Sequence, residues 1–122
     1  MATWIFAEWL LIWILDTTTF AFEWDQGNRT KSTTKHDVTT DEVERVFRLK
    51  QAVPLGVQTS PVVNELCLGL VGQSDRGRVL QVAFTFRGSK VRVISARPAH
   101  RKERSQYDTM AREIFPDLQR PV

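Results

Sequence analysis

Residues 78–95 read RVLQVAFTFRGSKVRVIS, and this stretch decides the fold. Apolar side chains alternate with other residues on both sides of Gly88-Ser89, which is the period of a half-buried strand. The pair Gly88-Ser89 is typical of a tight turn between antiparallel strands. The stretch therefore predicts a β-hairpin with one face on a core. Parity places Arg78 on the same face as Leu80.

Further strands are expected on the N-terminal side of this hairpin. Residues 66–71 form an apolar run of strand length, and residues 20–24 alternate in the manner of a first strand. Pro54 and Pro61 bracket a loop or an edge strand, because proline cannot donate to a central ladder. These segments predict an antiparallel sheet of three to four strands.

Two or three helices should pack on that sheet. Thr39 and Glu42 have the spacing of a capping box, in which the Thr hydroxyl accepts an amide and the Glu reaches back to the Thr39 amide. This helix should end near Leu49. Residues 25–37 are polar and predict at most a short, irregular helix.

A C-terminal helix is expected between Pro98, in its first turn, and Phe115-Pro116. Its packing face follows the helical spacing and consists of Tyr107, Met110, Ala111 and Ile114. The expected fold class is α+β: a small antiparallel sheet packed with two or three helices.

Length and charge limit the function. The chain has 122 residues and a net charge of +3, which is one domain and excludes a multi-domain enzyme. Residues 76–104 hold nine bases and one acid, whereas residues 1–27 hold four acids and no base. The Arg-rich stretch favours a phosphate-bearing partner, although a solvated basic face without a ligand is the alternative. Cys67 is the only cysteine, which is typical of a reducing, cytoplasmic setting.

The first 19 residues stand apart. Residues 4–15 read WIFAEWLLIWIL, too short to span a membrane and without the positive start of a secretory signal. Three interpretations are open: an interfacial or partner-binding segment, an extra buried element, or a translated upstream stretch absent from the functional protein. The expected organisation is an extension over 1–19, a single domain over 20–115 and a tail over 116–122.

A series of motifs occurs in a fixed order over roughly residues 20–108. They are Phe22-Glu23-Trp24-Asp25, Lys35-His36, Val46-Phe47, Gly77-Arg78-Val79-Leu80, Thr85-Phe86-Arg87-Gly88, Arg92-Val93-Ile94-Ser95-Ala96-Arg97, Arg101-Lys102-Glu103-Arg104 and Tyr107. Together they resemble the BrnT-type toxins of type II toxin–antitoxin systems.

The resemblance implies a RelE-like fold and a bacterial, cytoplasmic ribonuclease that inhibits translation without a metal or other cofactor. It also implies neutralisation by a BrnA-type antitoxin, a ribbon-helix-helix protein, with operator DNA reached only through that antitoxin. No membrane association is expected.

Cleavage of RNA without a metal needs a base, an acid and cations that stabilise the phosphorane. The resemblance and the residue types indicate His36, Arg97, Tyr107 and Lys35 as catalytic residues. Histidine is the side chain that ordinarily titrates closest to neutral pH. The alternatives are a local hydrogen-bonding role for His36 and a core position for Tyr107.

Four further arginines are expected to bind RNA phosphates: Arg78, Arg92, Arg101 and Arg104. Salt bridges to Asp25 and Glu103 are the competing interpretation for the strand arginines, and His100 could replace His36. The chain departs from the family pattern at Asp37, Ser32 and His100. The alternative function is therefore a non-catalytic, basic nucleic-acid-binding or interaction module, a degraded toxin.

Overall fold

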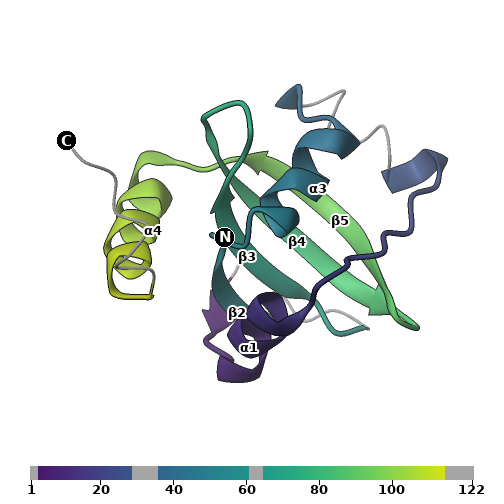
Figure 1. Ribbon diagram of the computed structural model, residues 1–122, viewed down its shortest axis with the longest axis horizontal. Coiled ribbons are helices and arrows are strands. Elements are labelled where there is room, and N and C mark those ends of the chain that lie inside the picture. Colours follow the sequence, from purple (N-terminus) through teal and green to yellow (C-terminus); the bar gives the residue numbers. More distant parts are fainter. Residues whose placement is uncertain (1–2, 29–35, 61–64, 115–122) are drawn as a thin grey trace.

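The computed structural model describes residues 3–28, 36–60 and 65–114 (Figure 1). Its elements in chain order are β1 (Thr3–Ile5), α1 (Glu8–Asp16), α3 (Thr40–Arg48), β2 (Val53–Ser60), β3 (Leu68–Gln73), β4 (Val79–Arg87), β5 (Lys90–Pro98) and α4 (Arg101–Ile114). The strands form one antiparallel sheet in the order β1-β2-β3-β4-β5. The α+β class is confirmed, but the sheet has five strands among the described residues, so the prediction of three to four was wrong.

The segment bracketed by the two prolines is the inner strand β2. Pro54 is tolerated because β1 pairs only with the far part of β2, from Val57 to Ser60. The ladder between β2 and β3 is irregular between Pro54 and Gly56. Gly56 has a φ of 116°, and a Cβ there would lie 1.8 Å from the Ile5 carbonyl oxygen. Only glycine allows β1 to approach this closely.

Residues 20–24 do not form the predicted first strand. They run beside β5 and make one isolated parallel bridge, between Phe22 and Val91. The backbone amide of Glu23 donates to the Val91 carbonyl, and the Val91 amide donates to the Ala21 carbonyl, both at 2.8 Å. The segment is held mainly by its apolar side chains, Phe20 and Phe22, on the core.

The predicted hairpin is present as β4 and β5. Leu80, Val82 and Phe84 are fully buried on one face, and Gly88 takes a positive φ of 63° in the turn. β5 extends to Pro98, so α4 starts at Arg101 rather than around that proline. The extension follows from pairing with the start of β4, since Pro98 is the partner of Leu80.

Helices cover both faces of the sheet. α1 and α3 lie over the face that carries Leu70 and Leu80, and their buried side chains join these in the main core (Figure 1). α4 packs on the opposite face through Tyr107, next to Val53 and Val71 of β2 and β3. The two faces therefore carry separate apolar clusters.

The N-terminal helix contributes to the main core. Leu10 and Ile14 have no exposed surface, and the Trp13 ring contacts four phenylalanine rings with centroid distances of 5.0–6.4 Å. These rings belong to Phe20, Phe47, Phe84 and Phe86. These contacts are typical of a buried element, and an extra buried element is one of the three interpretations that the sequence left open for this segment.

We expect Trp13→Ala to lower the free energy of unfolding by about 3 kcal/mol, because it removes the ring that joins α1 to the sheet and to α3. Trp9→Ala, on the exposed side of the same helix, should cost less than about 1 kcal/mol. Urea unfolding followed by far-UV circular dichroism measures both. Equal losses would contradict a core role for α1.

Candidate functional site

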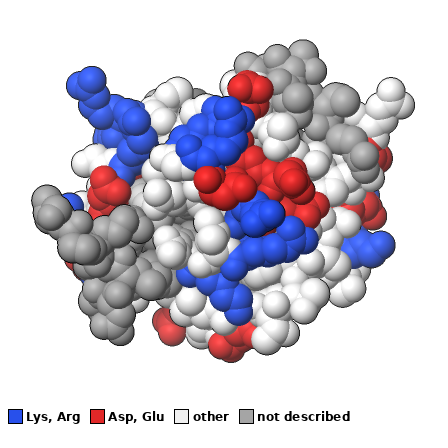
Figure 2. Space-filling model, turned by 45° about the horizontal axis from the view of Figure 1, so that its top comes forward, with Lys and Arg blue, Asp and Glu red and all other residues white. Residues whose placement is uncertain are grey.

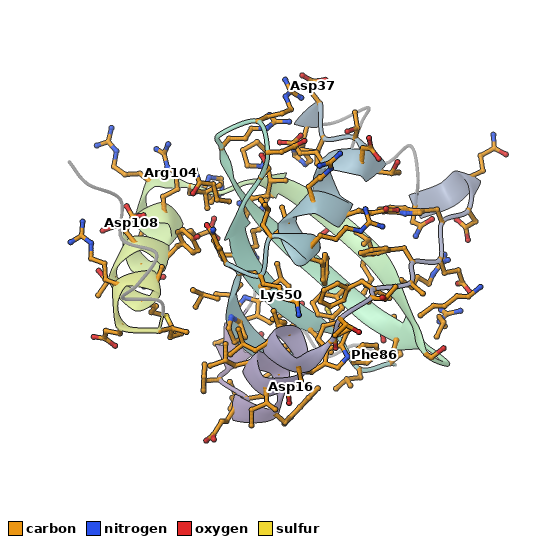
Figure 3. All side chains as sticks on the ribbon, in the orientation of Figure 1. Asp16, Asp37, Lys50, Phe86, Arg104 and Asp108 are labelled. Carbon is orange, nitrogen blue, oxygen red and sulfur yellow. The ribbon has the colours of Figure 1, made fainter. Side chains whose placement is uncertain are left out.

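Charged residues gather at one end of the sheet, which we call the charged end. It consists of residues 36–42 before and in α3, residues 74–78 in the β3–β4 turn, and residues 97–104 from β5 into α4 (Figure 1). Asp37 and Arg104 lie on this side of the molecule, whereas Asp16 lies at the opposite end (Figure 3). The charged end holds most of the residues that the sequence singled out.

The first group at the charged end is built on Glu42, whose side chain is buried. Arg78 donates to both carboxylate oxygens, from Nε and from Nη2, at 2.7 Å each. The Ser74 hydroxyl donates to Oε2 at 2.7 Å, and Arg76 Nη1 lies 3.5 Å from Oε1. A bidentate Arg–carboxylate pair of this kind is both strong and directional.

Electrostatics keep Glu42 charged. Burial alone raises the pKa of its carboxyl, but the hydrogen bonds from Arg78 and Ser74 and the positive charges of Arg78 and Arg76 outweigh burial, so that the pKa lies below its usual value. Half of the predicted capping pair is present, since Thr39 Oγ1 accepts the Glu42 amide at 3.2 Å. The Glu42 carboxylate binds Arg78 and Ser74 instead of the Thr39 amide.

His36 lies beside this group. Its side chain is exposed, and the next residue, Asp37, has a φ of 55°. The Asp37 carbonyl accepts hydrogen bonds from Arg78 and, at 3.3 Å, from Arg76. The backbone next to His36 is therefore fixed by the two arginines. Lys35, the other predicted catalytic residue here, lies outside the described residues.

The second group lies on the other face of the sheet. Arg97 binds both carboxylate oxygens of Glu103, at 2.9 and 2.8 Å, and also donates to the Gln81 side chain. Glu103 accepts the His100 amide at 2.8 Å and so caps the start of α4. Burial raises the pKa of the Glu103 carboxyl. The hydrogen bonds from Arg97 and from the His100 amide outweigh burial, so that the pKa lies below its usual value.

The structure separates some residues that the sequence grouped together. Arg78 contacts α3 on one face of the sheet, while Arg97 contacts the start of α4 on the other. Arg92 is five positions from Arg97 along β5, about 16 Å at strand spacing. Its guanidinium binds Asp25 at 2.8 Å and Glu23 at 3.0 Å. Arg92 thus lies away from the charged end. It forms salt bridges, which was the competing interpretation of this arginine.

The first turn of α4 holds three cations of the charged end that have no acidic partner among the described residues. Arg101, Lys102 and Arg104 are exposed, and no carboxylate among the described residues forms an ion pair with them. Elsewhere the charged end is mixed: Figure 2 shows groups of basic side chains directly beside acidic ones. At the charged end, the basic run in the sequence therefore leaves cations without an acidic partner where α4 begins.

Tyr107 is a packing residue. It is 5% exposed, contacts the apolar cluster of β2 and β3, and its hydroxyl donates to the Gln51 carbonyl at 3.0 Å. A cavity of about 400 Å³ lies between α4 and these strands, and Tyr107 and Glu103 are among its lining residues. The structure thus agrees with the core alternative for this tyrosine.

Sequence reasoning missed four members of the two groups. They are Glu42, which accepts from Arg78, Ser74 and Arg76, which contact the Glu42 carboxylate, and Gln81, which accepts from Arg97. One signal was available, because Glu42 is four residues before Val46 and thus on the buried face of α3. A carboxylate on a buried face needs a cationic partner. Nothing in the local sequence indicates that Ser74 would hydrogen-bond to Glu42 or that Gln81 would accept from Arg97.

Two features are absent from residues 3–28, 36–60 and 65–114. No group of three or more His, Cys, Asp and Glu side chains could hold a metal ion. None of the helices has the length and apolar content needed to cross a membrane.

The fold is that of a known bacterial toxin. The crystal structure of the Brucella abortus ribonuclease toxin BrnT matches with a TM-score of 0.50 and 23% sequence identity, and covers 68% of this chain and 100% of that chain. A search among curated proteins gave no match.

The family follows from the sequence. The family described as "Ribonuclease toxin, BrnT, of type II toxin-antitoxin system" matches residues 24–103, and the chain belongs to it. The matched range includes β2 to β5, α3 and both groups of the charged end, and it lies within the expected domain over 20–115.

Glu42→Gln tests the first group. We expect it to lower the free energy of unfolding at neutral pH by about 3 kcal/mol, because Arg78 loses its charged partner in a buried site. The folded-state pKa of Glu42 is lowered, so the wild-type advantage is present above its ordinary value of 4.5 and disappears as the pH falls through the folded pKa.

Urea unfolding at neutral pH and near pH 3 measures this effect. Glu65→Gln is the matched control, since Glu65 pairs with Arg87 at 3.3 Å in an exposed position and should contribute less than about 1 kcal/mol. If wild type and Glu42→Gln differ in free energy of unfolding by the same amount at both pH values, the stabilisation does not depend on the charge of Glu42, and the prediction is wrong.

Proposed function

We propose that this chain is a cytoplasmic toxin that inhibits translation by cleaving RNA without a metal ion, and that the charged end is its active surface. Membership of the BrnT family, over residues 24–103, is the observation that carries this proposal. The charged end supports it, because it combines two exposed histidines with cations that can bind phosphate.

RNA binding is assigned first to Arg101 and Arg104 on the first turn of α4, together with Lys102. These side chains are exposed and have no acidic partner among the described residues, so a phosphate displaces only water and counterions. Arg97 lies just before them, at the end of β5. A phosphate could share its guanidinium with Glu103, since guanidinium has five donors.

Proton transfer is assigned to His36, with His100 as the competing residue. His36 is adjacent to a backbone carbonyl held by Arg78, so its position relative to the β3–β4 turn is fixed. His100 is adjacent to the free cations of α4. In either case the arginines supply the positive charge that stabilises the phosphorane, which in many nucleases a metal provides.

The proposed partner is a BrnA-type antitoxin with a ribbon-helix-helix DNA-binding domain. Membership of a type II toxin–antitoxin family supports an antitoxin partner in general. Operator DNA would then be contacted by the antitoxin alone. The basic surface of the toxin suits either an RNA backbone or an acidic region of the antitoxin.

A second candidate, a non-catalytic basic module, is favoured by one observation. Arg78, Arg92 and Arg97 are all bound to carboxylates within the chain. Arginines engaged in this way hold the fold, and a degraded toxin would retain them for that reason alone. Such a module would bind RNA in a salt-dependent manner and leave its length unchanged.

Alanine variants distinguish the roles. We expect His36→Ala to reduce the rate of RNA cleavage by about 100-fold or more, as for loss of a general base, and Arg97→Ala to cause a loss of similar size. His100→Ala should have a smaller effect. The measurement is single-turnover cleavage of a labelled RNA by purified toxin, with Arg87→Ala, an exposed arginine at the opposite end of β4, as the control.

The pattern of losses decides between the candidates. A large loss in His100→Ala with unchanged activity in His36→Ala would transfer the proton-transfer role to His100. Salt-sensitive RNA binding by the wild type, with products of unchanged length, would support the non-catalytic module.

Metal independence is tested separately. We expect cleavage to continue at the same rate, within about twofold, after dialysis against EDTA, because arginines stabilise the transition-state charge. Rates are compared with and without added Mg²⁺ at constant ionic strength, so that screening does not change. Loss of cleavage in EDTA that Mg²⁺ restores would contradict this part of the proposal.

A further inference from the structure

One continuous stretch of the chain exposes large apolar side chains. The exposed fractions along residues 5–15 are Ile5 63%, Phe6 50%, Trp9 46%, Ile12 49% and Leu15 41%. We call these five residues the N-terminal apolar surface. Only two other large hydrophobic residues in the described chain, Leu49 and Leu66, are exposed to this degree. A concentration of this kind on a folded protein marks an interaction site.

The geometry of α1 explains this exposure. Leu10 and Ile14 face the core, whereas Trp9 and Ile12, three positions apart, lie on the opposite side of the helix. The helix is therefore apolar all round, which is typical of a helix buried on every side. One side is covered by the sheet, and the other is open in the isolated chain.

Acidic residues frame this surface. Glu8 begins α1 and Asp16 ends it, and the first 27 residues contain no Lys or Arg. Lys50 is the cation in contact with the helix, where its amino group donates to the Leu15 carbonyl at 3.1 Å. The open side of α1 thus combines apolar side chains with a carboxylate at each end.

This charge pattern discriminates among the possible occupants. A membrane surface carries anionic lipids, which attract basic rather than acidic segments. A second copy of the chain related by a two-fold axis would bring the same carboxylates together. A segment with apolar residues and flanking cations matches both features, and complementary charge fixes its register.

We propose that the N-terminal apolar surface binds a helical segment of another protein, with an apolar stripe flanked by Lys or Arg. The surface lies before the residues matched by the toxin family and at the opposite end of the molecule from the charged end (Figure 3). A partner bound there leaves the charged end open. The interaction is therefore spatially separate from the proposed site of RNA cleavage.

Synthetic helical peptides test this proposal on the full-length chain. The probe has leucines at helical spacing and flanking lysines, and its twin has glutamates in place of the lysines. By isothermal titration calorimetry, we expect the wild type to bind the lysine peptide at least about tenfold more tightly than the glutamate twin. The double variant Glu8→Lys, Asp16→Lys should reverse this preference.

A further variant separates docking from general attraction between opposite charges. Ile12→Glu adds a negative charge and removes an apolar contact, so docking predicts weaker binding of the lysine peptide by about tenfold, whereas general attraction predicts stronger binding. Leu66→Glu is the matched control at an exposed apolar residue outside the surface, and it should bind like the wild type.

Three results would overturn the proposal. The first is equal affinity of the wild type for both peptides, which needs no variant and so does not depend on variant folding. The second is sedimentation with phosphatidylglycerol vesicles that Ile12→Glu abolishes, since this assigns the surface to lipid. The third is a concentration-dependent dimer lost in Ile12→Glu, which assigns it to a second copy.

Discussion

The buried carboxylate of Glu42 ties the first turn of α3 to the turn between β3 and β4. A charge at 2% exposure is stable in a protein only with close partners, so Arg78 and Ser74 are held to it. Arg78 in turn binds the Asp37 carbonyl and fixes the chain just before α3. The position of His36 thus depends on an ion pair that involves no atom of its own side chain.

The charged residues of this small protein have two distinct uses. Arginines at or next to the strand ends, such as Arg78 and Arg97, are bound by carboxylates from α3 and α4 and connect helices to the sheet. The cations on the first turn of α4 have no such partner among the described residues and face solvent. At the charged end, a polyanion could therefore bind the cations of α4 directly, whereas it would compete with carboxylates for Arg78 and Arg97. Net charge along the sequence does not reveal this division.

The local part of the fold was predictable, and the long-range part was not. The β4–β5 hairpin follows from alternation around Gly88, and α3 follows from its Thr39 cap, because both signals lie within a few residues. β2 was obscured by Pro54, whose tolerance depends on where β1 ends. The Arg78–Glu42 pair joins residues 36 positions apart, and no local pattern specifies it. Residue types therefore indicated the kind of site, but not which arginines are engaged.

β1 is three residues long, yet it determines what the sheet presents to its surroundings. It occupies the outer edge of β2 through pairs such as Ile5 with Val57. In a chain without this strand, the amides and carbonyls of β2 would form an open edge, and the loss of α1 would uncover the rings around Phe47 and Phe84. Such edges template pairing between molecules. Forms of this protein that lack β1 and α1 should therefore accumulate as aggregates.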